Sequence, residues 1–178
     1  MSENLDLFIL EEIQNLLKKN IDKNFIESLK TKKGNTQNAE RIYIKKIKDI
    51  FDENDITYEE AASQQSKDFR NINKTELNLE CKKTDSLTIY FNDTCPNKDI
   101  NYCIIFTGNK KSPPQLVFIN GQKIVETSMP WIDDYTRELT ILKDKYCRGE
   151  NKKKLCGMME VYARPTYKAN IECLLEKY

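Results

Sequence analysis

Apolar positions in the first third of the chain recur at helical spacing. Between residues 5 and 18 they return every three or four positions, which predicts an amphipathic helix. After a polar turn, residues 39–54 repeat the pattern, with Ile42 and Ile47 among lysines and acids. We therefore predict that residues 1–55 form a helical scaffold that also offers a dimerisation surface.

From residue 77 onward the apolar period changes to two, which is the period of strands. Segments rich in turn formers interrupt this pattern, and Asn120 followed by Gly121 suits a tight hairpin. Several strands are therefore predicted to be antiparallel neighbours. Four strands are predicted, at residues 77–82, 87–92, 102–107 and 116–119.

A further helix is predicted towards the end of the chain, where Ser128 can cap it and Pro130 lies just inside its start. Its apolar positions run from Trp131 to Tyr146, and a strand-like stretch follows at residues 158–163. These patterns predict one domain of the α/β class, with a central mixed β-sheet flanked by helices.

Histidine is absent from all 178 residues, which narrows the possible chemistry. Acid–base catalysis by histidine, Ser-His or Cys-His nucleophile pairs and histidine-held metals are excluded. Any catalysis must use carboxylates, lysine, tyrosine or metal-bound water. The six cysteines include no CxxC pair and are predicted to be reduced thiols.

Charge and hydropathy set weaker limits on partners. The net charge of +1 neither requires nor forbids a nucleic-acid partner, so a local basic patch would have to supply the contacts. No apolar stretch approaches the roughly 20 residues that cross a bilayer, and the start, MSENLDLF, lacks the basic and apolar runs of a signal peptide. We expect a cytoplasmic protein with no membrane partner.

The strand predicted at residues 77–82 carries the side chains best suited to chemistry. Its apolar residues alternate with polar ones, so Glu80 and Lys82 project from the same face. Taken alone, this pair is explained equally well as an ion pair on an exposed sheet face. A second Glu-x-Lys, at residues 150–152, lies in a basic run without strand alternation.

Asp68, in the segment SKDFRNI, can complete a metal site with Glu80 if a short hairpin joins the two segments. Two carboxylates held close together repel each other, which favours a divalent cation between them, and hard oxygen ligands suit Mg²⁺. The metal can bind a phosphate and activate water, while Lys82 can stabilise the developing negative charge. Asp85 and Asp93 are alternatives to Asp68, and either would need a permuted arrangement of strands.

The segments DFRNI, LECKKTDSLTIYFNDTCP and INYCIIFTG resemble the catalytic segment of type II restriction endonucleases of the PD-(D/E)XK superfamily. The resemblance covers about a third of the chain. It implies a restriction-endonuclease-like fold with Asp68, Glu80 and Lys82 as catalytic residues. It also implies that Asp68, Glu80 and the Cys81 carbonyl hold Mg²⁺. Lys67 stands where the family often has a proline, which is not a ligand.

Basic and hydroxyl-bearing residues near these segments are predicted to contact DNA phosphates or base edges, with solvated surface as the alternative. They follow the predicted catalytic lysine, occupy the loop after the next strand or belong to the basic C-terminal part: Lys83, Thr84, Ser86, Lys110, Lys111, Arg148, Arg164 and Lys168.

The resemblance thus implies a site-specific type II restriction endonuclease that hydrolyses phosphodiester bonds of double-stranded DNA with Mg²⁺. Residues 64–119 would form the catalytic core, and residues 128–178 would add a helix and a DNA-contacting part. A homodimer would match the symmetry of the cut site. Two alternatives stay open: a non-catalytic nucleic-acid-binding or interaction domain, and a repair-type nuclease of the same superfamily.

Overall fold

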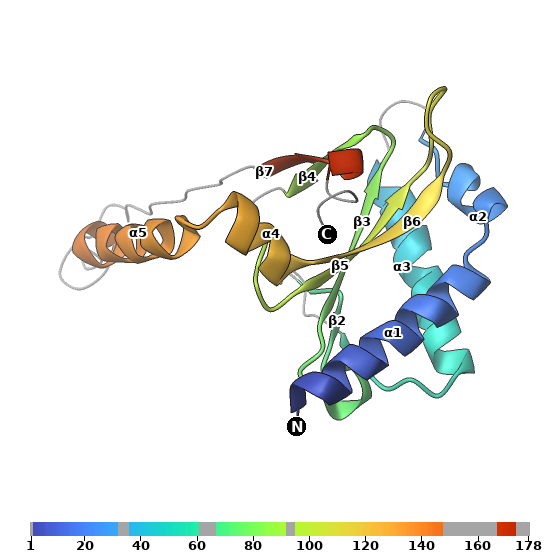
Figure 1. Cartoon of the computed structure of the whole chain (residues 1–178), viewed down its shortest axis with the longest axis horizontal. Helices are drawn as coiled ribbons and strands as arrows, with labels where there is room; N and C mark the ends of the chain where they lie inside the picture. Colours follow the sequence, from blue (N-terminus) through green and yellow to red (C-terminus); the bar gives the residue numbers. More distant parts are fainter. Residues whose placement is uncertain (1, 32–35, 61–66, 92–94, 148–166, 174–178) are drawn as a thin grey trace, which may run out of the picture.

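The computed structural model centres on a five-stranded sheet with the strand order β1-β2-β3-β5-β6 (Figure 1). It describes residues 2–31, 36–60, 67–91, 95–147 and 167–173. β3 and β5 run parallel, and the other neighbouring strands are antiparallel. The prediction of an α/β protein with a mixed sheet is therefore confirmed. The strands are β1 (Glu59–Glu60), β2 (Phe69–Arg70), β3 (Leu79–Thr84), β5 (Asn101–Phe106) and β6 (Gln115–Asn120).

Three helices, α1 (Ser2–Asn20), α2 (Lys23–Ser28) and α3 (Thr36–Glu53), pack together on one face of this sheet (Figure 1). α1 and α3 confirm the two helices predicted from apolar spacing. α2 was not predicted because it is short. It begins where the Asp22 carboxylate accepts a hydrogen bond of 2.7 Å from the backbone N–H of Phe25.

The face of α3 that meets the sheet differs slightly from the predicted one. Tyr43 and Ile47 are fully buried, whereas Ile42 is 47% exposed. The Tyr43 hydroxyl donates a 3.1 Å hydrogen bond to the carbonyl oxygen of Cys103 on β5. A buried tyrosine with a satisfied hydroxyl thus takes the core position that the isoleucine was expected to fill.

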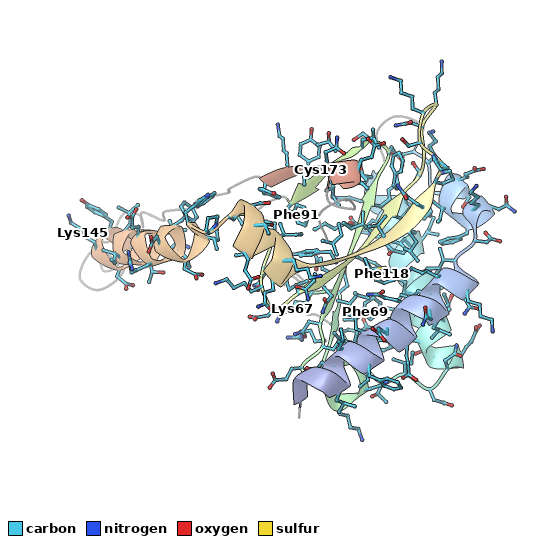
Figure 2. All side chains as sticks on the ribbon, in the orientation of Figure 1. Lys67, Phe69, Phe91, Phe118, Lys145 and Cys173 are labelled. Carbon is cyan, nitrogen blue, oxygen red and sulfur yellow. The ribbon has the colours of Figure 1, made fainter. Side chains whose placement is uncertain are left out.

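The opposite face of the sheet is covered by a small second sheet, in which β4 (Thr88–Phe91) pairs antiparallel with β7 (Tyr167–Asn170). Its inner face packs against β5 and β6 in a separate apolar cluster. Figure 2 shows Phe91 and Phe118 on opposite sides of the central sheet. The predicted strand at residues 87–92 therefore exists but leaves the central sheet, and β7 was not predicted.

The hairpin predicted at Asn120 and Gly121 is wrong, because α4 (Gly121–Ser128) begins there. The Asn120 side chain caps α4 by accepting a hydrogen bond from the N–H of Lys123. Gly121 is needed for close approach, since a Cβ on it would lie 2.0 Å from the carbonyl oxygen of Asn97.

The start predicted for the last helix is also wrong. Ser128 is the final residue of α4 rather than a cap, and α5 (Ile132–Cys147) begins after a break at Met129. The strand-like residues 158–163 lie outside the described residues.

Candidate active site

The candidate site lies where one edge of β3 is open. β2 pairs with β3 only at Phe69 and Leu79, so no strand of the described residues lies beside the edge of β3 beyond Leu79. The chain from β2 to β3 makes a 3-10 turn (Ile72–Lys74) and returns antiparallel, which confirms the predicted hairpin between Asp68 and Glu80.

Asp68 fills the place of a strand neighbour at this edge. Its Oδ2 accepts a hydrogen bond of 2.7 Å from the backbone N–H of Cys81, and Figure 2 labels its two neighbours, Lys67 and Phe69. The N–H and C=O groups of one residue in a strand point to the same edge. The Cys81 carbonyl therefore faces the same edge as Asp68, whereas the Cys81 thiol is buried beneath the sheet.

Glu80 and Lys82 lie on the same face of β3, as the alternation predicted. Lys82 Nζ is 3.1 Å from Glu80 Oε1, and the two side chains are 17% and 15% exposed. The other oxygen, Glu80 Oε2, is buried and accepts no hydrogen bond from the described residues. An unpartnered buried carboxylate oxygen is costly, so it marks a position where a cation or a donor is missing.

A third acid, Glu40 of α3, lines the same hollow of ≈ 660 Å³ as Asp68, Glu80 and Lys82. Burial raises the pKa of Glu40, the Lys82 ammonium lowers it and Glu80 raises it further. Glu40 was not singled out from the sequence, where it belongs to the acids of a predicted scaffold helix. The available signal was its position four residues before Ile44, on the stripe that faces the sheet.

Crowding of these carboxyls is clearest at Asp68. Burial raises the pKa of Asp68, the charges of Glu80 and Glu40 add to the increase, and the pKa is about 7 despite the Cys81 N–H and Lys82. Among the described residues, however, no three acidic or cysteine side chains stand close enough together to form a metal site. The acids line one hollow without converging on one point.

Asp85, the described alternative to Asp68, has other partners. Its carboxylate accepts hydrogen bonds from Thr31 and Thr107 and from Lys83 Nζ at 2.7 Å. Burial by itself would raise the pKa of Asp85, but the hydrogen bonds outweigh burial and lower it to about 2. Asp85 is therefore held as an internal ion pair, and Asp93 lies outside the described residues.

Several predicted DNA contacts have structural partners instead. The Lys83 side chain is 2% exposed and pairs with Asp85 and Thr31, so it is engaged inside the protein. Thr84 is buried, and its hydroxyl donates to the carbonyl of Thr88. The hydroxyl of exposed Ser86 donates to the same carbonyl.

The remaining predicted DNA contacts lie in three places. Lys110 and Lys111 are exposed in the loop between β5 and β6. Lys168 is exposed on β7, with its Nζ 5.3 Å from the ring centre of Tyr90, which lines the hollow. Arg148 and Arg164 lie outside the described residues.

Comparisons with protein-family models, with curated proteins and with solved structures find no match for this chain. Within the described ranges, no helix is both long enough and apolar enough to cross a membrane.

Proposed function

We propose that the protein is a Mg²⁺-dependent endonuclease with a restriction-endonuclease-like fold, which hydrolyses phosphodiester bonds of double-stranded DNA at defined sites. One observation carries the proposal: Asp68 and Glu80 line one hollow with Lys82 at an open strand edge, and a buried oxygen of Glu80 has no hydrogen-bond partner among the described residues. Acidic ligands beside a lysine suit metal-assisted phosphoryl transfer and need no histidine.

The residues fit a magnesium ion by the chemistry of their donors. Asp68, Glu80 and the Cys81 carbonyl would hold it, since these residues line one hollow and offer the oxygen ligands that Mg²⁺ prefers. Bound there, the ion would lower the pKa of a coordinated water and neutralise charge on the phosphate. The unpartnered Glu80 Oε2 and the raised pKa of Asp68 both indicate a site with an excess of acidic oxygen.

Lys82 supplies the positive charge that the reaction requires from the chain. The oxygen of a water bonds to phosphorus, one P–O ester bond breaks, and a phosphate monoester and a hydroxyl result. Negative charge grows on the phosphoryl oxygens in the transition state, and the Lys82 ammonium stabilises it from a half-buried position. The 3.1 Å contact with Glu80 holds the ammonium over the hollow rather than in solvent.

The substrate would approach along the β4–β7 sheet. Its inner residues Ile89 and Phe91 are buried, while Tyr90 is 45% exposed at the rim of the hollow. Tyr90 and Lys168 are cross-strand partners, so a ring and an ammonium stand together on a rigid surface. A cation can hold a phosphate there, and a ring can pack on a sugar or a base.

The decisive test incubates the purified protein with plasmid and phage DNA in Mg²⁺ or in EDTA. We expect discrete fragments that disappear in EDTA and in the Lys82→Ala variant. Lys45→Ala, which removes an exposed lysine from the same helix as Glu40, is the matched control and should cut like the wild type. Intact DNA in every lane across several substrates would refute the proposal.

Metal binding has a test that does not depend on cutting. Mg²⁺ should raise the melting temperature of the wild type but not that of Glu80→Gln, because a ligand that binds only the folded state stabilises it. An equal ionic strength of NaCl is the control. Equal shifts in both proteins would remove Glu80 from the metal site.

One observation favours a non-catalytic nucleic-acid-binding domain as the second candidate. The Glu80 and Lys82 side chains pair with each other, as they would if both had a purely structural role. DNA binding that needs no metal and survives Glu80→Ala would select this function. A repair-type nuclease would instead cut branched or damaged DNA and leave intact plasmid uncut.

A further inference from the structure

α5 stands apart from the rest of the molecule. The helix projects from the body beside α4, and Lys145 lies near its far end, distant from Phe69 and Phe91 (Figures 1 and 2). None of its residues is buried. Yet Ile141, Leu142 and Tyr146 are 60%, 42% and 40% exposed. Among the described residues, no residue of α5 belongs to either apolar cluster, so its exposed apolar side chains form a candidate interaction surface.

The length of α5 makes the need for a partner stronger. The helix has 16 residues, and helices of about 12–15 residues are only marginally stable in water without tertiary packing. α1 provides the contrast, because it also exposes apolar residues, such as Leu7 and Phe8, but buries its other side in the core. α1 packs into the core, whereas α5 contributes no residue to either apolar cluster of the described chain.

Five apolar residues of α5 form one seam along the helix. They are separated by alternating steps of three and four, which is the spacing at which two helices wind around each other in a coiled coil. Ile141 is apolar but lies off this seam. The seam residues are Ile132, Tyr135, Leu139, Leu142 and Tyr146.

Charged residues beside the seam match a second copy of the same helix. Glu138 directly precedes the seam residue Leu139, and Lys143 directly follows Leu142. In a parallel in-register pair, the flanking position before one seam residue faces the flanking position five residues later on the other helix. Glu138 then lies opposite Lys143 of the partner subunit, and the two-fold axis repeats the pair on the other side.

We propose that α5 is a self-association surface, on which a second copy of this chain packs its own α5 in parallel. All five seam residues then meet their counterparts, and two ion pairs flank the seam. The surface is separate from the hollow at β3, so the proposal stands or fails independently of the proposed cutting activity. It places the dimer contact on α5 rather than on residues 1–55, where the sequence predicted it.

The oligomeric state of the full chain tests the proposal. Sedimentation over a concentration series should give a dimer for the wild type and for Ile141→Glu, the off-seam control. Leu139→Glu should weaken association by at least about tenfold, because a charge then enters the seam. A monomeric wild type would overturn the proposal. So would equal weakening by both substitutions.

Two further variants test the pairing itself and guard against misfolding. Glu138→Lys should weaken the dimer, and adding Lys143→Glu to it should restore association, which a misfolded helix would not do. Leu139→Cys should form an intermolecular disulfide under mild oxidation, because identical seam positions meet in a parallel pair. A dimer without rescue, or without this cross-link, would overturn the parallel arrangement.

Discussion

At the scale of single residues, Asp68 accepts a hydrogen bond that the fold uses, and it also lies among like charges that destabilise its ionised form. Its hydrogen bond from the Cys81 N–H fixes the open edge of β3, while Glu80 and Glu40 surround it with like charge. Lys82 is the cation that faces this group from β3. An acid in such a position indicates a function, because a neutral side chain could accept the same hydrogen bond without the free-energy cost of a buried charge.

Replacing Asp68 should therefore make the metal-free protein more stable at high pH. The pKa of Asp68 is about 7 in the folded state, above the ordinary value of 3.8. The folded protein therefore has its full stability below about pH 4, where Asp68 is protonated, and loses part of it as the pH rises through 7. Asp68→Asn stays neutral and can still accept the Cys81 N–H. Its free energy of unfolding should exceed that of the wild type by about 4 kcal/mol at pH 8 and nearly match it at pH 4.

Urea unfolding in EDTA at both pH values measures this difference. Asp99→Asn, which changes an exposed carboxyl near the start of β5, is the control and should show no such dependence on pH. A wild type that is as stable as Asp68→Asn at pH 8 would mean that the carboxyls do not repel each other in the folded state.

At the scale of elements, the Asp85 cluster ties separate parts of the chain together. Asp85 follows β3, and it accepts hydrogen bonds from Thr31 after α2 and from Thr107 at the end of β5, as well as from Lys83. The cluster thus fixes the carboxyl ends of the two parallel strands against the helical layer. Asp85 and Lys83 also line the hollow, so the cluster holds β3 in place at the wall of the site.

Removing Asp85 should destabilise the protein, because the nearly buried Lys83 ammonium would lose its charged partner. We expect Asp85→Ala to cost about 2 kcal/mol in the free energy of unfolding at neutral pH, measured in urea. Asp133→Ala breaks an exposed ion pair of 2.6 Å with Lys98 and should cost no more than about 0.5 kcal/mol. Equal costs for the two variants would contradict the structural role of the cluster.

The β4–β7 sheet yields a separate prediction about binding. With Glu80→Gln as the non-cutting background, Lys168→Ala should weaken duplex DNA binding and reduce its salt dependence by about one counterion. Tyr90→Ala should weaken binding about tenfold without changing the salt dependence. Fluorescence anisotropy over a range of salt measures both effects, and unchanged binding in both variants would remove this sheet from the DNA surface.

At the scale of the whole molecule, regular patterns were predictable and long-range contacts were not. The apolar period predicted α1, α3 and the strands β3, β4, β5 and β6, and the alternation around Glu80 predicted the face of β3. The hairpin predicted at Gly121 was wrong because the glycine is required for close packing against Asn97 and not for a turn. The sequence alone does not distinguish these two reasons for a glycine. The spacing from Ile44 places Glu40 on the inner stripe of α3, but that Glu40 shares a hollow with Asp68 depends on how α3 packs against β3, which the spacing does not encode.

β5 lies between two hydrophobic clusters and contributes residues to both. Cys103 and Ile105 belong to the cluster with the helices, while Tyr102, Ile104 and Phe106 belong to the cluster with the β4–β7 sheet. Neither cluster can open without uncovering the strand on which the other rests. The helical layer and the small sheet therefore cannot serve as independent modules, and a chain cut between β4 and β5 would regain its structure only by reassociation of the two fragments.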